Sequence, residues 1–146
     1  MKLRFQRHII GLSALALLAL TQTAAMADDK FNDVTIKSKK LDNNTYMFIG
    51  AGGNIGVSAG SDGILIIDDQ YAPLADKITA ALNQIQPGAP KYIVNTHYHA
   101  DHTGGNAHFG EQGTILAHHN VLKRLQAQNK IASSALPVIT YGDNIS

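Results

Sequence analysis

The sequence predicts an α/β fold in which helices pack on a mixed sheet. Two observations predict it. Short runs rich in β-branched and aromatic residues alternate with segments whose apolar residues recur at helical spacing, and Gly, Pro, Asn or Asp residues separate these elements. An initial meander followed by alternating helices and strands is the order expected of α/β layering. The 146 residues contain no repeat or proline-rich linker, so one domain or part of one is expected.

The meander is predicted from three short runs. Thr45 to Ile49 is bounded by asparagines and Gly50, and Asn54 to Ala59 follows the Gly52-Gly53 pair. A turn of Ser, Asp and Gly then precedes the apolar run Ile64 to Ile67. We expect these three strands to be joined as hairpins.

The alternation of helices and strands begins after Pro73, a residue tolerated in the first turn of a helix. Apolar residues recur from Ala75 to Ile85 until Pro87-Gly88 ends the helical pattern. Strands are predicted at residues 92–94 and 115–117, and a second helix at about 119–129.

The first 27 residues resemble a secretory signal peptide. Lys2, Arg4 and Arg7 precede an apolar run over residues 9–20, and Ala25-Met26-Ala27 matches a small-x-small cleavage site. A dozen apolar residues are too few to span a bilayer, although an uncleaved anchor is the alternative. We therefore predict a domain over residues 28–146 that is exported, periplasmic or secreted, with no stable membrane anchor after cleavage.

Composition excludes some partners and some forms of stabilisation. Cleavage would leave nine Lys and Arg against 11 Asp and Glu, so no basic face is expected for nucleic acid. The Lys37 to Lys40 cluster is read as a solvated strand edge or turn. Cysteine is absent, so disulfide bonds are excluded. The fold must be stabilised by its hydrophobic core or by a bound metal.

The run from Thr96 to Gly105 carries the predicted chemistry. Imidazoles and a carboxylate fall at His97, His99, Asp101 and His102, and these are nitrogen and oxygen donors that zinc favours. On an extended backbone His97 and His99 would project to the same side and could reach one metal. Asp101 and His102 suit an adjacent second metal. Iron or manganese could bind the same donors. The alternative is that these residues cluster by chance and bind no metal.

This run resembles the His-x-His-x-Asp-His signature of the metallo-β-lactamase fold superfamily, which includes class B β-lactamases and glyoxalase II-like thioesterases. Gly63 to Asp69, Gly104-Gly105-Asn106 and Ile115 to Leu122 also resemble that family. The resemblance implies that the chain is the N-terminal half of an αββα sandwich, a mixed sheet with flanking helices. It also implies a truncated chain that, in isolation, binds zinc weakly and hydrolyses nothing.

The resemblance implies a role for each site residue. His97 and His99 would bind the first of two zinc ions, and Asp101 and His102 the second. Asp68 would orient the metal-binding loop, with a plain turn or capping role nearly as well supported. Asp101 would also be catalytic, because it would orient a metal-bound hydroxide that attacks the carbonyl of an amide, ester or thioester.

The resemblance leaves the small-molecule substrate open, with a β-lactam as one option. Many β-lactamases of this class carry Arg where His102 stands, so the chain is more similar to thioesterase-like and His-rich lactamase branches. The family's third histidine, bridging aspartate and final histidine lie downstream of this motif, and no matching segment follows here. His118 and His119 are predicted to start a helix, with metal ligation as the minor alternative, and His108 to lie on a surface turn.

Two further readings stay open. The chain could be a non-catalytic remnant or a metal-binding module that acts only with a partner chain. A zinc-scavenging protein is less well supported, because no long histidine tract is present. The sequence does not determine the oligomeric state.

Overall fold

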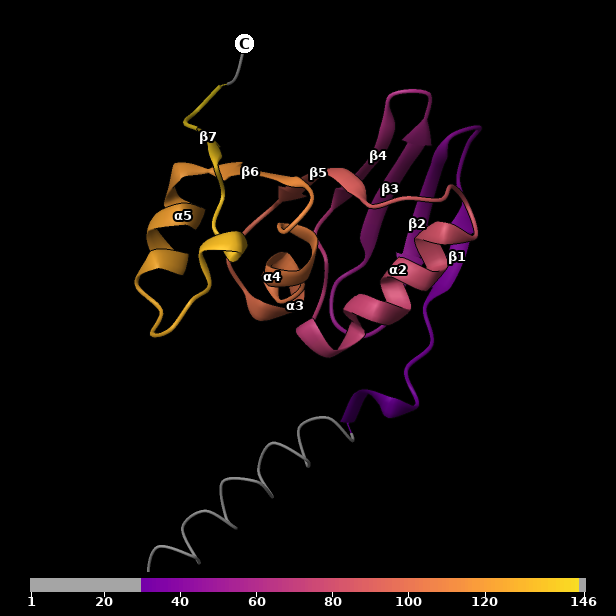
Figure 1. Ribbon diagram of the computed structural model, residues 1–146, viewed down its shortest axis with the longest axis horizontal. Helices are drawn as coiled ribbons and strands as arrows, with labels where there is room; N and C mark the ends of the chain where they lie inside the picture. Colours follow the sequence, from indigo (N-terminus) through magenta and orange to yellow (C-terminus); the bar gives the residue numbers. More distant parts are fainter. Residues whose placement is uncertain (1–29, 145–146) are drawn as a thin grey trace, which may run out of the picture. The chain divides into compact units, whose positions relative to one another are not determined.

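A computed structural model describes residues 30–144, and its strands form a single seven-stranded sheet (Figure 1). The chain divides into two units between Asp33 and Val34, and the whole sheet belongs to the second. The predicted leader over residues 1–27 lies outside the described residues. Within residues 30–144, no helix has the length and apolar character needed to cross a bilayer.

The first half of the sheet is an antiparallel meander. Its strands are β1 (Lys37–Lys40), β2 (Thr45–Ile49), β3 (Ile55–Gly60) and β4 (Gly63–Ile67). Register places Phe48 opposite Ile55 and Val57 opposite Ile66, so buried residues of neighbouring strands share one face. The three strands predicted from the sequence are confirmed.

The second half of the sheet is parallel. The 3₁₀ turn η1 (Ala72–Leu74) and helix α2 (Ala75–Asn83) connect β4 to β5 (Pro90–Asn95). Two short helices, α3 (Ala100–Thr103) and α4 (Asn106–Phe109), lead to β6 (Thr114–His118). Helix α5 (His119–Gln126) and the turn η2 (Ser133–Ala135) then lead to β7 (Ile139–Tyr141). The predicted mixed α/β sheet with flanking helices is therefore confirmed.

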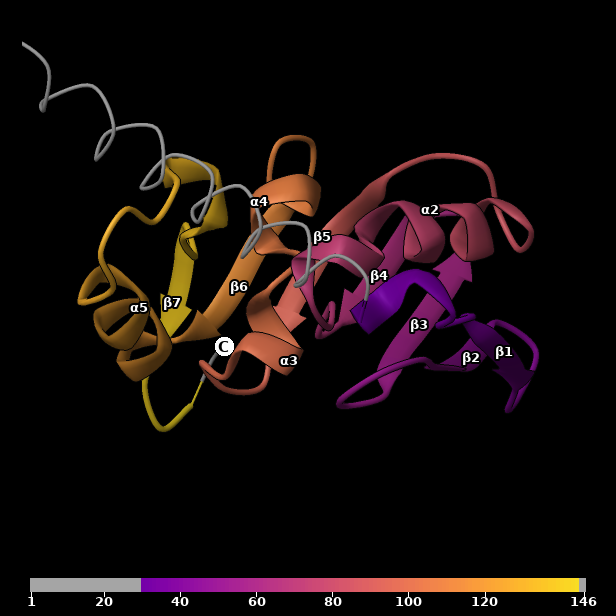
Figure 2. The ribbon, with the colours of Figure 1, turned by 90° about the horizontal axis from the view of Figure 1, so that it is seen from below.

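The core lies between one face of this sheet and its helices, which gather on that side (Figure 2). Side chains alternate along each strand, so every second residue enters the core. The strand residues buried in this way include Phe48, Ile55, Val57, Ile64, Ile66, Ile93, Ile115 and Ala117, and α2 contributes Ile78 and Leu82.

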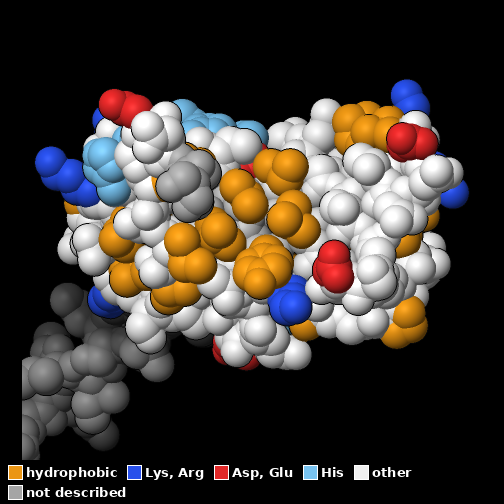
Figure 3. All heavy atoms as spheres, turned by 90° about the horizontal axis from the view of Figure 1, so that it is seen from above, with side chains coloured by type: hydrophobic (Ala, Val, Ile, Leu, Met, Phe, Trp, Pro, Cys, Tyr) orange, Lys and Arg blue, Asp and Glu red, His pale blue; other side chains and the backbone are white. Residues whose placement is uncertain are grey.

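The opposite face of the sheet is apolar, and within residues 34–144 no helix covers it (Figure 2, Figure 3). Figure 3 shows hydrophobic side chains gathered over this face, with histidines along one rim. Ile49, Ile67, Tyr92 and Ile139 keep 38–42% of their surface exposed, and Leu65, paired with Tyr92, lies on the same face. An exposed apolar face of this kind is typical of a surface that packs against another protein segment or chain.

The structure differs from the sequence prediction at β7 and at the end of α5, and it agrees with the prediction at the Lys37 to Lys40 cluster. β7 was not predicted, because three residues between Pro137 and Gly142 are too few to show an alternating pattern. The helix expected to reach residue 129 ends at Gln126, since Leu125 is the last of its residues to enter the core. The cluster from Lys37 to Lys40 is the exposed edge strand β1, in keeping with the solvated edge expected there.

Candidate metal site at the carboxyl edge of the sheet

The predicted site residues lie where parallel strands end. Asp68 directly follows β4, and Thr96 and His97 directly follow β5, which is the neighbour of β4 in the sheet. The chain then passes through His99, the N-cap of α3, and enters the helix that carries Asp101 and His102. Crevices at the carboxyl ends of parallel strands are the usual binding positions in open α/β sheets.

The four predicted ligands come together as two pairs. Nε2 of His97 lies 3.1 Å from Nδ1 of His99, and Oδ2 of Asp101 lies 3.3 Å from Nε2 of His102. The pairs are adjacent, because the ring centroids of His97 and His102 are 4.0 Å apart. Among residues 30–144, no three histidine or carboxylate side chains converge as one metal-holding set.

Asp68 is the acceptor at the centre of this arrangement. It is 4% exposed, and Oδ1 accepts a hydrogen bond of 2.8 Å from the backbone amide of Thr96. Oδ2 accepts from the Thr96 hydroxyl at 2.7 Å and lies 2.8 Å from Nδ1 of His102. One carboxylate therefore contacts the segments that carry both pairs.

These contacts determine which ring nitrogens carry protons. A carboxylate oxygen accepts, so Nδ1 of His102 donates to Asp68, and in a neutral ring Nε2 then carries the lone pair. The Thr96 hydroxyl donates its single proton to Asp68, so its oxygen accepts from Nδ1 of His97 at 3.1 Å. Nε2 of His97 is then also unprotonated. Nε2 of His97 faces Nδ1 of His99, and Nε2 of His102 faces Oδ2 of Asp101. Two acceptor atoms at such a distance need a proton or a metal ion between them.

The pairs fit zinc in chemistry and in spacing. With zinc–nitrogen distances of about 2.0–2.1 Å, two ligands of a tetrahedral ion lie about 3.3 Å apart. The separations of 3.1 and 3.3 Å agree with that value. A histidine that donates its other nitrogen to a carboxylate, as His102 does to Asp68, is the usual arrangement of a zinc ligand. Each pair supplies two ligands of the four that a zinc ion takes.

A buried polar frame lies beneath the ligand loop. The carbonyl of His102 accepts from the amide of Asp69 at 3.1 Å and from Nδ2 of Asn95 at 3.4 Å. Asn95 and Asn106 exchange two hydrogen bonds of 3.0 and 2.9 Å, and both are fully buried. Sequence reasoning missed these residues, although an asparagine that ends a buried strand was a signal of an internal polar contact.

Asp69 is a buried carboxyl group with an unusual pKa. Burial raises its pKa from 3.8 to about 8, a shift that the hydrogen bond from the Gly105 amide opposes and the charge of Asp68 reinforces. Oδ1 accepts from that amide at 2.8 Å, whereas Oδ2 has no protein partner. At neutral pH the group is therefore mainly protonated and neutral in the folded chain.

The other histidines of residues 30–144 lie outside the two pairs. His118 is the N-cap of α5, where its Nδ1 accepts from the amide of Asn120 at 3.1 Å, and His119 begins the helix. The helix-start prediction for both is confirmed. His108 is exposed as predicted, although it lies on α4 rather than on a turn.

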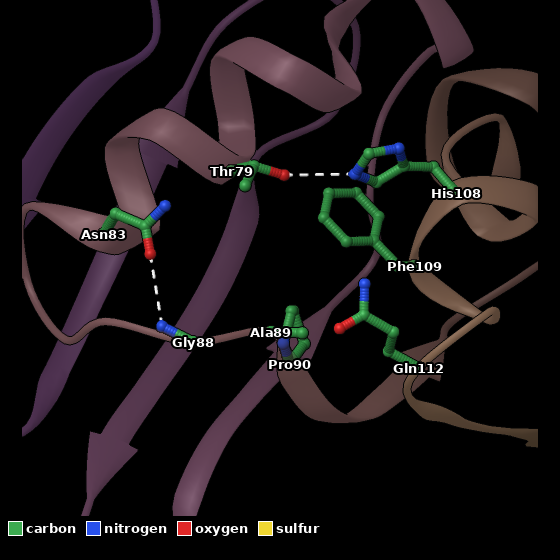
Figure 4. Close-up of a pocket in the computed structure, with 8 residues that line it drawn as sticks. All are labelled: Thr79, Asn83, Gly88, Ala89, Pro90, His108, Phe109 and Gln112. Carbon is green, nitrogen blue, oxygen red and sulfur yellow. Dashed lines mark hydrogen bonds between the residues drawn. The ribbon is translucent and has the colours of Figure 1, made fainter.

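A surface cavity of about 260 Å³ lies at the opposite, amino-terminal end of β5 (Figure 4). His108 contributes to it through a 3.2 Å contact between its Nε2 and the hydroxyl of Thr79. Asn83, whose Oδ1 accepts from the amide of Gly88 at 3.2 Å, lines the same cavity. The cavity contains none of the paired ligands, so the candidate chemistry lies elsewhere.

Comparison with known proteins agrees with this fold. The metallo-beta-lactamase superfamily matches residues 41–139 of the chain. No curated protein matches it in sequence.

Several solved structures are similar in fold. A B3 metallo-beta-lactamase with an active-site glutamic acid is 23% identical, with a TM-score of 0.60 over 70% of this chain and 40% of that one. DIM-1 metallo-beta-lactamase is 18% identical, with a TM-score of 0.63 over 78% of this chain and 55% of that one. BJP-1, a subclass B3 metallo-beta-lactamase of Bradyrhizobium japonicum, is 22% identical, with a TM-score of 0.60 over 81% of this chain and 48% of that one. The chain thus spans about half the length of these structures.

Replacing Asp68 with Asn should weaken zinc binding about 10- to 100-fold, because an amide in either orientation cannot accept at both oxygens as the carboxylate does. Equilibrium dialysis with a competing chelator measures this affinity. Asp62→Asn, in the exposed turn between β3 and β4, is the matched control and should bind zinc as wild type does. Equal affinities in the two variants would contradict the central role of Asp68.

Replacing Asp69 with Asn should remove the part of the pH dependence of the free energy of unfolding that comes from this carboxyl group. The raised pKa means that, between about pH 4 and pH 8, the folded state holds a proton that the unfolded state releases. Its contribution to the free energy of unfolding therefore falls as pH rises through this window. Urea denaturation of zinc-free protein should show a flatter pH profile for Asp69→Asn than for wild type or Asp62→Asn. Identical slopes would contradict a buried, protonated Asp69.

Proposed function

We propose that this chain, which belongs to the metallo-beta-lactamase superfamily, supplies the zinc-binding half of an exported hydrolase. The observation that carries the proposal is the pairing of His97 with His99 and of Asp101 with His102, each at the spacing of two zinc ligands. The matched family segment includes all four residues.

When bound, zinc would supply a Lewis acid and a nucleophile at neutral pH for attack on a carbonyl group. The chain's own residues would prepare the site for it. Asp68 holds the protons of His102 and, through Thr96, of His97 on the nitrogens that face away from the metal. The Asp101 side chain, about 30% exposed, is open to a substrate and would accept a proton or orient the attacking water.

A β-lactam amide is the substrate class that we propose first. The similar solved structures described above are metallo-beta-lactamases, and two of them are described as B3 enzymes. A thioester or another ester is the alternative, since the same chemistry attacks all three carbonyls. The leader-like residues 1–27 support export.

A second candidate is a metal-binding module that acts with a partner chain. The open apolar sheet face favours it, because a protein surface rarely leaves so much apolar area exposed. The two-ligand pairs favour it as well, because further ligands would have to come from another segment or another chain. This candidate predicts that zinc binds without any hydrolysis by the chain alone.

Replacing His99 with Ala separates these functions in the protein recovered from its native source. The hydrolase predicts that the variant loses zinc and that hydrolysis of a chromogenic β-lactam falls to background. Metal analysis and absorbance assays provide the two measurements, repeated with a thioester and an aryl ester. His119→Ala, an exposed residue whose Nδ1 lies 3.2 Å from the Tyr141 carbonyl, is the control and should retain both properties. Hydrolysis that survives in His99→Ala would contradict the proposal, and zinc binding by wild type without hydrolysis of any of the three substrates would favour the partnered module.

A further inference from the structure

We propose that Gln70 is a positioning residue for Asp101 and His102, acting through the glycine loop over residues 50–54 between β2 and β3. This inference rests on the proposed function, since it concerns the pair assigned to the second zinc. It assigns a role to a fully buried side chain and to a loop that the sequence motif does not include.

Gln70 is placed between two loops. It is fully buried, and its φ of 56° lies in the left-handed region, which is uncommon for a residue other than glycine. Its side-chain nitrogen donates to the carbonyl of Gly53, and its backbone carbonyl accepts from the amide of Gly105 at 3.2 Å. Gln70 therefore joins the glycine loop to the end of the ligand loop.

Its other side-chain atom is also confined by the glycine loop. Oε1 of Gln70 is buried without a protein partner, and a Cβ added to Gly50 would lie only 2.5 Å from it. A buried side-chain oxygen that has no hydrogen-bond partner lowers the stability of the folded state. Backbone strain together with an unsatisfied buried atom is characteristic of positions retained for a site.

The glycine loop packs directly on the second pair. A Cβ on Gly52 would lie 2.6 Å from Cβ of Asp101, and one on Gly53 would lie 2.5 Å from Cε1 of the His102 ring. Neither distance is tolerated by a real side chain, and Gly52 also has a φ of +83°. The ligands Asp101 and His102 therefore contact bare backbone that only glycine can supply.

Two of the contacts of the His102 ring restrain its rotation. Asp68 holds Nδ1 by a hydrogen bond, and Gly53 lies against the Cε1 side. The bond from Gln70 holds Gly53 there. If this bond is lost, the loop can withdraw and the ring can rotate about Nδ1, which moves the lone pair of Nε2 away from Asp101.

The test compares Gln70→Met and Gly53→Ala with Gly142→Ala. Methionine keeps the volume of glutamine but cannot donate to Gly53, and alanine at 53 pushes the His102 ring. A Cβ on Gly142 meets only ordinary contacts at 3.8 Å or more, so this control tests the effect of a glycine substitution by itself.

Two readouts are used for each variant. Cobalt titration followed by visible absorption measures the affinities of the two metal pairs, and nitrogen NMR of metal-free protein measures the His102 ring. We expect about tenfold weaker binding at the Asp101–His102 pair in both test variants, with the His97–His99 pair and the melting temperature of Gln70→Met unchanged. The His102 ring resonances should shift in both test variants and not in Gly142→Ala.

Wild-type His102 resonances and wild-type metal affinities in Gln70→Met would overturn the proposal. An equal loss at both metal pairs, or a loss matched by a large drop in melting temperature, would overturn it in favour of a purely structural role. If wild-type protein binds no metal, the proposed function fails, whereas the His102 resonances of the metal-free variants still decide the role of Gln70. If Gly53→Ala does not fold, Gln70→Met provides the same decision.

Discussion

The carboxylate of Asp68 is the interaction on which the rest of the site depends. It accepts from the backbone and hydroxyl of Thr96 and from the ring of His102, so it joins the end of β4 to the segment that follows β5 and to helix α3. When the two rings are neutral, these bonds place the proton of His102 and, through the Thr96 hydroxyl, that of His97 on Nδ1 and leave the lone pair on Nε2. The fold itself therefore orients these ring nitrogens, as the carboxylate partner of a histidine ligand does in zinc sites.

The segment from Asp68 to Gln70 combines backbone strain with a buried carboxyl group. Asp68 and Gln70 both have positive φ values, 63° and 56°, within three consecutive residues, and Asp69 between them is a fully buried carboxyl group. Each of these features is unfavourable for the fold. Their coincidence at the carboxyl edge, beneath the histidines, is explained if the segment is retained for the geometry of the site. The apolar run Ile64 to Ile67 before Asp68 and the buried residues of β5 pack in the core and hold this segment in place.

The sequence predicted the parts of the fold that depend on local pattern. Strands such as Thr45–Ile49 and helix α2 followed from residue type and periodicity, and the proximity of His97, His99, Asp101 and His102 followed from their spacing. The short β7 and the early end of α5 were missed because tertiary contacts decide them. Gln70, Asn95 and Asn106 were missed for the same reason, since their partners lie 7 to 29 positions away along the chain. Asp68 was predicted only through family resemblance, and its contact with His102 across 34 positions explains why spacing alone could not show it.

The most direct test of this account is the tautomeric state of the histidine rings in metal-free protein. Long-range proton–nitrogen NMR correlates each ring nitrogen with its carbon-bound protons and so shows which nitrogen carries the hydrogen. The account predicts that His97 and His102 both carry it on Nδ1 at a pH where the rings are neutral, with Nε2 unprotonated. A hydrogen on Nε2 of His102 would mean that Asp68 does not prepare this ligand, and the central claim would be wrong.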